Sequence, residues 1–214
     1  MKCVLHIGTE KTATTTIQEF LYHNRVQLGN FGIGMSSVLG MPNNRKLCAY
    51  FQKDFDDYFF RQGLHSLSQR ETHFLGMLDS LKEEVAELDA NNGKLFVITS
   101  EHFHSRLLEI SEIEHLRDAL AEIFTETRIL CYFREQSELV RSLYSTAIRV
   151  GYDTPFRNFA ETANPDNNYY NYFKFFSKWS EAFGKNRVSA MIFDGKKFYD
   201  GDIRKDFLRR VDQE

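Results

Sequence analysis

The 214-residue chain contains only three cysteines and three prolines, and its formal net charge is −3. Three cysteines form no disulfide framework, and we expect Cys3 and Cys131 to be small buried residues of core strands, which suits a reducing compartment. The small net charge gives no electrostatic reason to bind nucleic acid or an anionic membrane. No apolar run approaches the roughly 18 residues of a membrane span, and the first residues lack a signal-peptide pattern. These absences predict a cytoplasmic protein.

One familiar phosphate-binding motif is also missing. A Walker A loop needs G-x-x-x-x-G-K-[ST], but none of the Gly-Lys pairs at 93–94, 184–185 and 195–196 is followed by a hydroxyl residue. The stretch Gly29–Gly34, GNFGIG, superficially suggests a dinucleotide turn. It follows a predicted helix rather than a strand, so we interpret it as a loop. A standard ATPase or kinase is therefore disfavoured.

Composition and apolar periodicity predict a single α/β domain over residues 1–214. Hydrophobic residues make up 42% of the chain and charged residues 27%, which is typical of a globular protein. Apolar runs of strand length alternate with segments of helical periodicity, and this order indicates a three-layer sandwich with a parallel central sheet. The expected strands are 3–8, 94–99, 127–133 and 187–193, and the expected helices are 14–28, 67–91, 111–124, 136–150, 168–183 and 202–212.

The first strand ends in a segment that has the residues of an anion site. Val4, Leu5 and Ile7 predict a buried strand, and Gly8 permits a sharp exit from it. Lys11 and a group of small residues then precede an amphipathic helix. The free N–H groups of that helix start, its dipole and the Lys11 ammonium would point into one pocket. We expect phosphate or sulfate there, bound by Lys11, Thr12, Ala13, Thr14, Thr15 and Thr16.

A second anion site is expected at the end of strand 127–133. Arg134 stands at its carboxyl end, and Ser142 follows about two turns into the next helix. Arginine offers a forked, permanently charged donor to phosphate oxygens. A surface ion pair for Arg134 and an ordinary exposed position for Ser142 are the bland alternatives. Two strand ends of one sheet with anion-binding residues favour the functional interpretation.

The stretch HIGTEKTATTTIQEFL resembles the 5′-phosphosulfate loop of sulfotransferases, in particular bacterial carbohydrate-type members. The family uses 3′-phosphoadenosine 5′-phosphosulfate (PAPS), and an Arg and a Ser at the spacing of Arg134 and Ser142 hold its 3′-phosphate. Ala13 stands where the family has glycine, which requires a backbone conformation that an L-residue tolerates. The resemblance implies a PAPS-dependent P-loop enzyme that transfers sulfonate to a hydroxyl, with a carbohydrate or glycolipid as acceptor. Lys11 would then be catalytic as well as cofactor-binding.

The proton acceptor is expected after strand 94–99. Glu101 is the first choice, because a carboxylate here resembles the base of glycan-directed sulfotransferases, and His102 is the second, as in small-molecule enzymes. Pairing of Glu101 with Arg106, or capping of the next helix, is the structural alternative. His102 and His104 could suggest a metal, but two ligands without a third predict none. His6 and Glu10 flank the loop and could touch the acceptor or simply pack and face solvent.

The resemblance continues from Tyr170 to Val211, where Trp179 lies in an aromatic helix that stops at Phe183-Gly184. It leaves the region from about residue 31 to 88 unmatched, and we expect residues 31–92 to be a helical insertion that lines the acceptor site. Two alternatives stay open: a P-loop kinase using ATP and Mg²⁺, and a degenerate domain that binds nucleotide without turnover. The Arg-Lys-Gly loop that closes cytosolic sulfotransferases is missing, so the chain is either truncated at its C-terminus or closes its site differently. Oligomeric state is not specified by the sequence.

Overall fold

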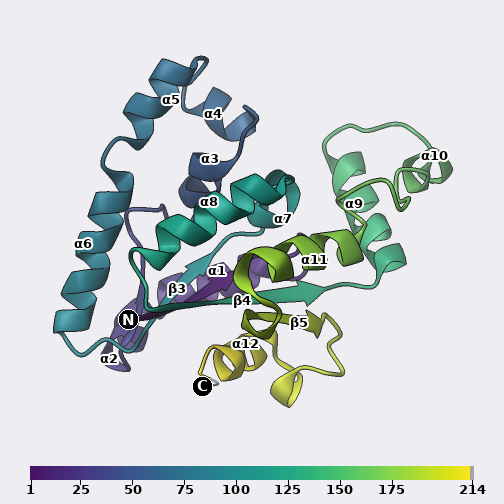
Figure 1. Cartoon of the computed structure of the whole chain (residues 1–214). Coiled ribbons are helices and arrows are strands. Elements are labelled where there is room, and N and C mark those ends of the chain that lie inside the picture. The colour runs from purple at the N-terminus through teal and green to yellow at the C-terminus, as the bar shows by residue number, and fades with distance from the viewer. Residues whose placement is uncertain (213–214) are drawn as a thin grey trace.

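The computed structural model describes residues 1–212 of the chain and contains a five-stranded parallel sheet (Figure 1). The strands are β1 (Lys2–His6), β2 (Ile33–Met35), β3 (Leu95–Thr99), β4 (Glu126–Phe133) and β5 (Val188–Ile192). Their order across the sheet is β2-β3-β1-β4-β5, so β1 is central. Lys2 of β1 pairs with Leu95 on one side and with Glu126 on the other. All four strand pairings are parallel.

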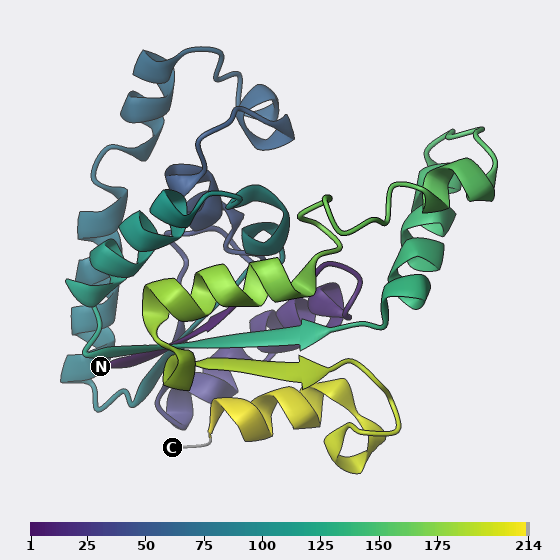
Figure 2. The same ribbon diagram turned by 45° about the vertical axis from the view of Figure 1, so that its right-hand side comes forward.

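Helices cover both faces of this sheet (Figures 1 and 2). On one face lie α1 (Thr14–His23), α2 (Arg25–Asn30) and α12 (Ile203–Val211). On the other lie α3 (Arg45–Phe51), α4 (Asp57–Arg61), α5 (Leu67–Phe74), α6 (Met77–Ala90), α7 (His102–Arg106), α8 (Ile110–Ala121) and α11 (Tyr172–Phe183). The predicted three-layer α/β sandwich with a parallel central sheet is confirmed.

The inner strands are mostly apolar and buried in their middle because helices cover both of their faces. Residues Cys3 to His6 of β1 and all five residues of β3 are buried. Leu5 packs into the core beneath α8 and α11, whereas Val4 packs into the core beneath α1 and α12. Cys3 and Cys131 are buried strand residues, as predicted, and Cys48 is buried too. Trp179 is fully buried in the aromatic helix α11.

Two of the predicted helices are interrupted. The helix expected over 14–28 ends at His23, and α2 begins after Asn24. The helix expected over 67–91 splits into α5 and α6 at Leu75 and Gly76, where glycine adopts φ +71°. A left-handed glycine cannot continue an α-helix, so the chain changes direction there. The later stop at Asn92-Gly93 is confirmed, because α6 ends at Ala90.

The interpretation of Gly29–Gly34 as a loop was wrong at both ends, since Gly29 and Asn30 are the last residues of α2. Ile33 and Gly34 belong to the short edge strand β2, which pairs with β3. A Cβ at Gly34 would lie 2.1 Å from Leu88 Cδ2, so helix α6 packs directly on this strand. Glycine is thus needed at position 34 for close packing between a helix and a strand, whereas in the sequence a glycine-rich stretch is typical of a loop.

Helices α9 (Gln136–Arg149) and α10 (Phe156–Ala160) form an arm that projects from the carboxyl end of β4 (Figure 2). The chain returns through a turn at residues 161–171 into α11, which begins at Tyr172 rather than at the predicted residue 168. Two short 3₁₀ segments, Lys185–Arg187 and Tyr199–Gly201, flank β5. Within residues 1–212, none of the helices has both the length and the apolar character to cross a membrane.

Candidate active site

A cavity of about 460 Å³ lies at the carboxyl ends of β1, β3 and β4. Ligands of open α/β sheets bind at this edge, and small-molecule sites commonly have 300–1,000 Å³. A groove of about 850 Å³ lies along α12 and is lined mainly by apolar residues, without the predicted site residues. The 460 Å³ cavity is lined by Glu10, Lys11, Ala13, Thr14, Thr15, Glu101, His102, Arg134, Ser142 and Phe193. We refer to it as the strand-end cavity.

The loop between β1 and α1, residues 8–13, is attached to β4 by its main chain. Tyr132 N donates to Gly8 O at 2.7 Å, and Thr9 N donates to Tyr132 O at 2.9 Å. Gly8 has φ +96°, and a Cβ there would lie 3.1 Å from the Cα of Glu101. Glycine is therefore needed both for the backbone turn and for the close approach of the two strand ends. We call residues 8–13 the anion loop.

Two residues of the anion loop adopt left-handed backbone angles, Lys11 with φ +64° and Ala13 with φ +57°. The sequence led us to expect a conformation that an L-residue tolerates at Ala13, and the structure places Ala13 in the left-handed region, where glycine is favoured. An L-residue pays about 1–2 kcal/mol for it, a cost that glycine avoids. Ala13 is the N-cap of α1 and makes no side-chain cap bond, so the first N–H groups of the helix have no capping side chain.

The hydroxyls of the loop differ in where they point. Thr12 is fully buried, and its Oγ1 donates to Thr9 O at 2.6 Å, so it stabilises the loop from inside. Thr14 and Thr15 line the strand-end cavity. Thr16 is exposed and does not line it. Thr14 and Thr15 thus lie where an anion in the cavity could be reached, and the anion-binding roles of all four threonines stay predictions.

Lys11 extends across the cavity to helix α9. Its Nζ donates to Thr146 Oγ1 at 2.9 Å, and Thr146 Oγ1 in turn donates to Ser142 O at 3.1 Å. Thr146 lies one turn after Ser142, a spacing at which helical side chains share a face. Thr146 was not predicted from the sequence, although its i, i+4 relation to Ser142 was available as a signal.

Arg134 and Ser142 both line the strand-end cavity, as their spacing predicted. Arg134 NH1 donates to Lys11 O at 3.1 Å and so joins the second anion site to the anion loop. Its guanidinium carbon lies 5.7 Å from the Phe193 ring centroid, and its NH2 lies 3.7 Å from Glu138. The exposed partner Glu138 shows that the surface ion pair exists beside the cavity contact.

Glu101 faces the anion loop from the end of β3. Its Oε2 accepts from Gln18 Nε2 at 2.6 Å and from Asn43 Nδ2 at 2.9 Å. The predicted alternative pairing with Arg106 is wrong, because Arg106 binds Asp56 instead. Glu101 is the N-cap of α7 but makes no side-chain cap bond. Gln18 and Asn43 were missed, and no signal in the sequence connects these amides to a carboxylate 83 and 58 positions away.

His102 also lines the cavity, at the start of α7. Burial, together with the nearby Arg45 and Arg106 cations, lowers the pKa of His102 to about 4. Its ring is therefore uncharged at neutral pH and able to accept a proton. Its Nδ1 is buried and has no hydrogen-bond partner among the residues that the structure describes.

His6 and Glu10, the two residues that flank the start of the anion loop, lie in different environments. His6 is fully buried in β1, and its Nδ1 lies 2.9 Å from Thr99 Oγ1, so it packs in the core and cannot touch an acceptor. Burial lowers its pKa to about 3. Glu10 lines the strand-end cavity and accepts from the hydroxyl of Tyr169 at 2.9 Å, which ties the chain after α10 to the anion loop.

His104 does not converge with His102 on a common ligand. It is buried, and its Nε2 lies 3.0 Å from Tyr169 O. Burial lowers its pKa to about 4, with the Tyr169 carbonyl acting weakly in the opposite direction. Within residues 1–212, no group of three or more His, Cys, Asp or Glu side chains is arranged to hold a metal ion.

The strand-end cavity therefore has two walls. One is cationic and rich in N–H donors, with Lys11, Arg134 and the start of α1, and we call it the anion wall. The other carries Glu101 and His102, two groups that can accept a proton, and we call it the acid–base wall. An anion on the first wall and a hydroxyl on the second would meet in one space. This arrangement suits transfer of a charged group to a hydroxyl.

The comparisons with known proteins give distant likenesses. No family model matches the chain. An uncharacterized protein of Archaeoglobus fulgidus is 30% identical to it over 115 residues, which are 54% of this chain and 29% of that protein. The chain thus matches less than a third of that relative's length. A crystal structure of a sulfotransferase from Alicyclobacillus acidocaldarius has a TM-score of 0.49 and 13% identity, over 89% of this chain and 72% of that one.

Proposed function

We propose that the protein is a sulfotransferase that uses PAPS and transfers its sulfonate group to a hydroxyl. The observation that carries the proposal is the strand-end cavity itself, in which Lys11, Arg134 and Ser142 stand beside Glu101 and His102. The resemblance of the anion-loop sequence to the 5′-phosphosulfate loop names the donor. Because the loop sequence resembles that of bacterial carbohydrate-type members of the family in particular, we propose a saccharide or glycolipid hydroxyl as the acceptor.

The anion wall would hold the donor in two places. Lys11, Thr14, Thr15 and the N–H groups at the start of α1 would bind the phosphosulfate, because cations and a helix N-terminus both favour negative charge. Arg134 and Ser142 would bind the 3′-phosphate with charge-assisted hydrogen bonds. The bound donor would supply the sulfonate. Lys11 would then release Thr146 and stabilise the negative charge that develops on the departing phosphate oxygen.

The acid–base wall would handle the acceptor. Glu101 or His102 would take the proton of the acceptor hydroxyl as its oxygen bonds to sulfur. Glu101 is held in place by Gln18 and Asn43 through one oxygen only, since both bonds fall on Oε2. A fixed carboxylate with a free oxygen and an uncharged imidazole are both suited to general-base work.

Calorimetric titration with 3′-phosphoadenosine 5′-phosphate (PAP), beside ADP and ATP–Mg²⁺, tests this proposal. We expect micromolar binding of PAP, with ADP at least about tenfold weaker because Arg134 and Ser142 would lose their phosphate. Arg134→Ala should remove the preference. Arg141→Ala is the matched control, because Arg141 lies beside Ser142 on α9 but is exposed, pairs with Glu138 and does not line the cavity.

The other outcomes are equally informative. Preference for ATP–Mg²⁺ over PAP would replace the proposal with a kinase-type activity. Binding of none of the three nucleotides would contradict it and leave a degenerate domain without nucleotide. Loss of PAP preference in Arg141→Ala as well as in Arg134→Ala would show that the 3′-phosphate lies elsewhere on α9.

A further inference from the structure

Apolar side chains gather at the outer end of the arm formed by α9 and α10 (Figures 1 and 2). In residues 1–212, thirteen large hydrophobic side chains are exposed, and four of them fall within nine consecutive positions there. Such close spacing makes a patch, whereas single exposed apolar residues are ordinary on protein surfaces. We call residues 148–157 the arm tip. Its exposed apolar side chains are Ile148, Val150, Tyr152 and Phe156.

The chain at the arm tip forms a closed, hydrogen-bonded turn. Val150 N and Tyr152 N both donate to Ala147 O, at 3.1 and 3.0 Å. Gly151 N donates to Ile148 O at 3.0 Å, and Gly151 has φ +94°, as is typical of a helix end. In this turn Val150 is 80% exposed and Tyr152 is 40% exposed. The turn therefore directs apolar side chains into solvent.

The four exposed side chains are not part of the core of the arm. That core contains Leu139, Val140 and Tyr170 and lies at the first turns of α9. Helix α10 contains no buried residue. Tyr144 and Phe159, which are half-buried, support the tip from within, with ring centroids 5.3 Å apart. The apolar surface of the tip is therefore left over once the arm has folded, and another molecule can cover it.

A lipid surface suits this patch better than a protein does. A stable protein interface buries about 800 Å² on each partner and takes roughly 20 to 30 residues from each, whereas the arm tip has only ten. A membrane needs no matching shape, because apolar side chains that enter its interface bind in proportion to the area they bury. Tyr152 adds a ring with a hydroxyl, a type of side chain enriched at the membrane–water interface.

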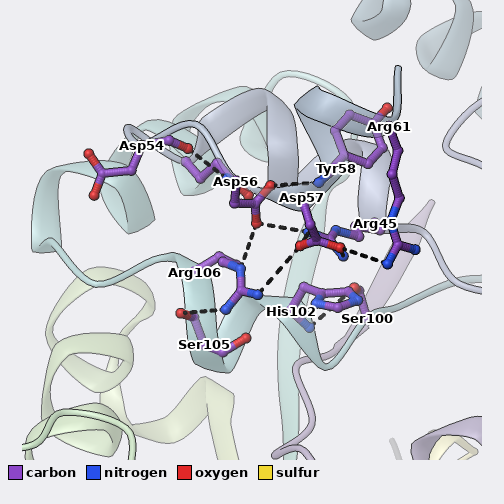
Figure 3. Close-up of polar contacts among 11 residues, drawn as sticks. Arg45, Asp54, Asp56, Asp57, Tyr58, Arg61, Ser100, His102, Ser105 and Arg106 are labelled. Carbon is purple, nitrogen blue, oxygen red and sulfur yellow. Dashed lines mark hydrogen bonds and ion pairs between the residues drawn. The ribbon is translucent and has the colours of Figure 1, made fainter. Parts of the chain in front are cut away.

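The charges of the arm tip favour an anionic lipid surface. Arg149 and Arg157 are its two cations, and Asp153 is its single acid. Arg149 bonds to uncharged groups of α9, and in residues 1–212 neither arginine forms an ion pair. Arg45 and Arg106, by contrast, are both paired with aspartates (Figure 3). Because the net charge of the whole chain is −3, attraction to an anionic surface has to be local.

The arm tip lies close to the strand-end cavity. Helix α9 carries Ser142 in the wall of the cavity and Ile148 at the tip. The two residues are six positions apart, which is about 9 Å along an α-helix. The arm leaves the sheet at the carboxyl end of β4, the edge at which the cavity lies (Figure 2). A head group of a few sugar units, on a lipid held at the tip, would therefore reach the cavity.

We propose that the arm tip docks on an anionic lipid surface, and that the acceptor is therefore a glycolipid rather than a free saccharide. Val150, Tyr152 and Phe156 enter the interface, and Arg149 and Arg157 meet the lipid phosphates. The choice of acceptor rests on the proposed sulfotransferase function, whereas the docking does not. Docking raises the local concentration of lipid-borne hydroxyl groups at the acid–base wall and leaves the chemistry there unchanged.

Co-sedimentation of the full chain with lipid vesicles tests the docking. Vesicles of phosphatidylcholine alone are compared with vesicles that also contain phosphatidylglycerol, which is anionic. We expect binding to the mixed vesicles and weaker binding to the neutral ones. Val150→Ser should weaken binding to the mixed vesicles about fivefold, because the exposed side chain loses its apolar surface. Adding Phe156→Ser should weaken it further.

Val26→Ser is the matched control. Val26 is 67% exposed on α2, on another side of the molecule from the arm (Figure 1), and its loss should leave vesicle binding unchanged. Two charge variants test the arginine contact. Arg157→Gln should weaken binding to the mixed vesicles roughly fivefold, and Asp153→Asn should strengthen it, because they change the charge of the tip in opposite directions. Neither should alter binding to the neutral vesicles.

Titration with PAP separates the docking from the proposed function, because the residues of the arm tip do not line the strand-end cavity. Val150→Ser should bind PAP like the unaltered chain, which also shows that the variant folds. Vesicle binding without PAP binding would contradict the sulfotransferase function and leave the docking supported. PAP binding without vesicle binding would overturn the docking and leave the function supported.

Two further results would overturn the docking. One is equal vesicle binding by Val150→Ser and Val26→Ser, since the patch would then make no contact with lipid. The other is a dimer in sedimentation velocity that Val150→Ser abolishes, because a second copy of the chain would then cover the arm tip.

Discussion

The two walls of the strand-end cavity are built by different means. The anion wall is held by main-chain bonds within the sheet, such as Tyr132 N to Gly8 O, and by Arg134 on the carbonyl of Lys11. The acid–base wall is held by side chains from elsewhere, including Asn43, which binds Glu101, and Asp56, which pairs with both Arg106 of α7 and Arg45 of α3. The difference teaches that the main chain of the anion wall is fixed by the sheet, with side-chain contacts to Thr146 and Tyr169 added, whereas the acid–base wall depends on the segment 43–57.

Acidification should destabilise the folded chain through two buried histidines. His6 lies at the end of β1, just before the anion loop, and His104 lies in α7, the helix that also contains His102. Burial lowers both pKa values, to about 3 and about 4, so the folded chain keeps these rings neutral while the unfolded chain protonates them below about pH 6.5. Their contribution is therefore present above pH 6.5 and lost as pH falls. From pH 6.5 to 5 we expect these two histidines to lower the unfolding free energy by about 3 kcal/mol, and His102, whose pKa is also lowered to about 4, to add roughly half as much again.

Urea unfolding at the two pH values measures this loss. His104→Gln should remove part of the pH slope, because the glutamine cannot titrate. His115→Gln is the control, since His115 is exposed and no slope change is expected. Equal slopes in all three proteins would show that His104 is as easily protonated in the folded chain as in the unfolded one.

Lys11→Ala should weaken nucleotide binding at the anion wall while leaving the stability of the fold nearly unchanged. We expect PAP affinity to fall roughly 100-fold, because a charge-assisted contact to phosphate is lost. The unfolding free energy should change by less than about 1 kcal/mol, since Lys11 is partly exposed and, within residues 1–212, its Nζ bonds Thr146 alone. Calorimetry and urea unfolding on the same variant give both numbers. Unchanged PAP affinity would remove Lys11 from the anion wall.

Asn44→Ala should lower the stability of the segment that supports the acid–base wall. Asn44 is buried, its Oδ1 accepts from Thr99 N at 2.9 Å and its Nδ2 donates to Gly40 O at 2.6 Å. We expect a loss of about 2 kcal/mol in the unfolding free energy because buried partners are left unsatisfied. Asn43→Ala, which loses only the bond to Glu101, should cost less than half of that. A larger loss of unfolding free energy in Asn43→Ala than in Asn44→Ala would contradict the expectation that Asn44 contributes more to stability.

Ala13→Gly is the smallest expected change. Glycine would relieve the left-handed strain of about 1–2 kcal/mol but loses more backbone entropy on folding, so the net stabilisation should stay below about 1 kcal/mol. Ala13→Val should instead destabilise, because a β-branched residue tolerates positive φ poorly. Thermal unfolding of the pair measures both. Higher stability of the valine variant would contradict the observed backbone conformation.

The sequence predicted the anion wall better than the acid–base wall, for a physical reason. Gly8, Lys11 and Arg134 are defined by their places at strand ends, and a strand end is visible as the limit of an apolar run. Gln18 and Asn43 act on Glu101 through tertiary contacts between segments whose own patterns say nothing of one another. The roles of the predicted site residues in binding and catalysis stay predictions.

The fold shows the same division. Long apolar strands and the layer order were predictable, because burial on both faces leaves a strong signal. The short edge strand β2 was not, since its Ile33 and Gly34 lie in a glycine-rich stretch typical of a loop. The break between α5 and α6 depends on one glycine with positive φ, which is invisible in hydrophobic periodicity.

The central place of β1 has a consequence for synthesis of the chain. Its first residue pairs with Leu95 and Glu126, and the anion loop binds Tyr132, all more than 90 positions later. A nascent chain that has left the ribosome only up to α6 therefore contains the whole anion-loop sequence without the strands that shape it. We expect anion affinity to emerge late, once β4 has been made, so that ribosome-bound fragments ending before β4 should not be retained by an immobilised nucleotide.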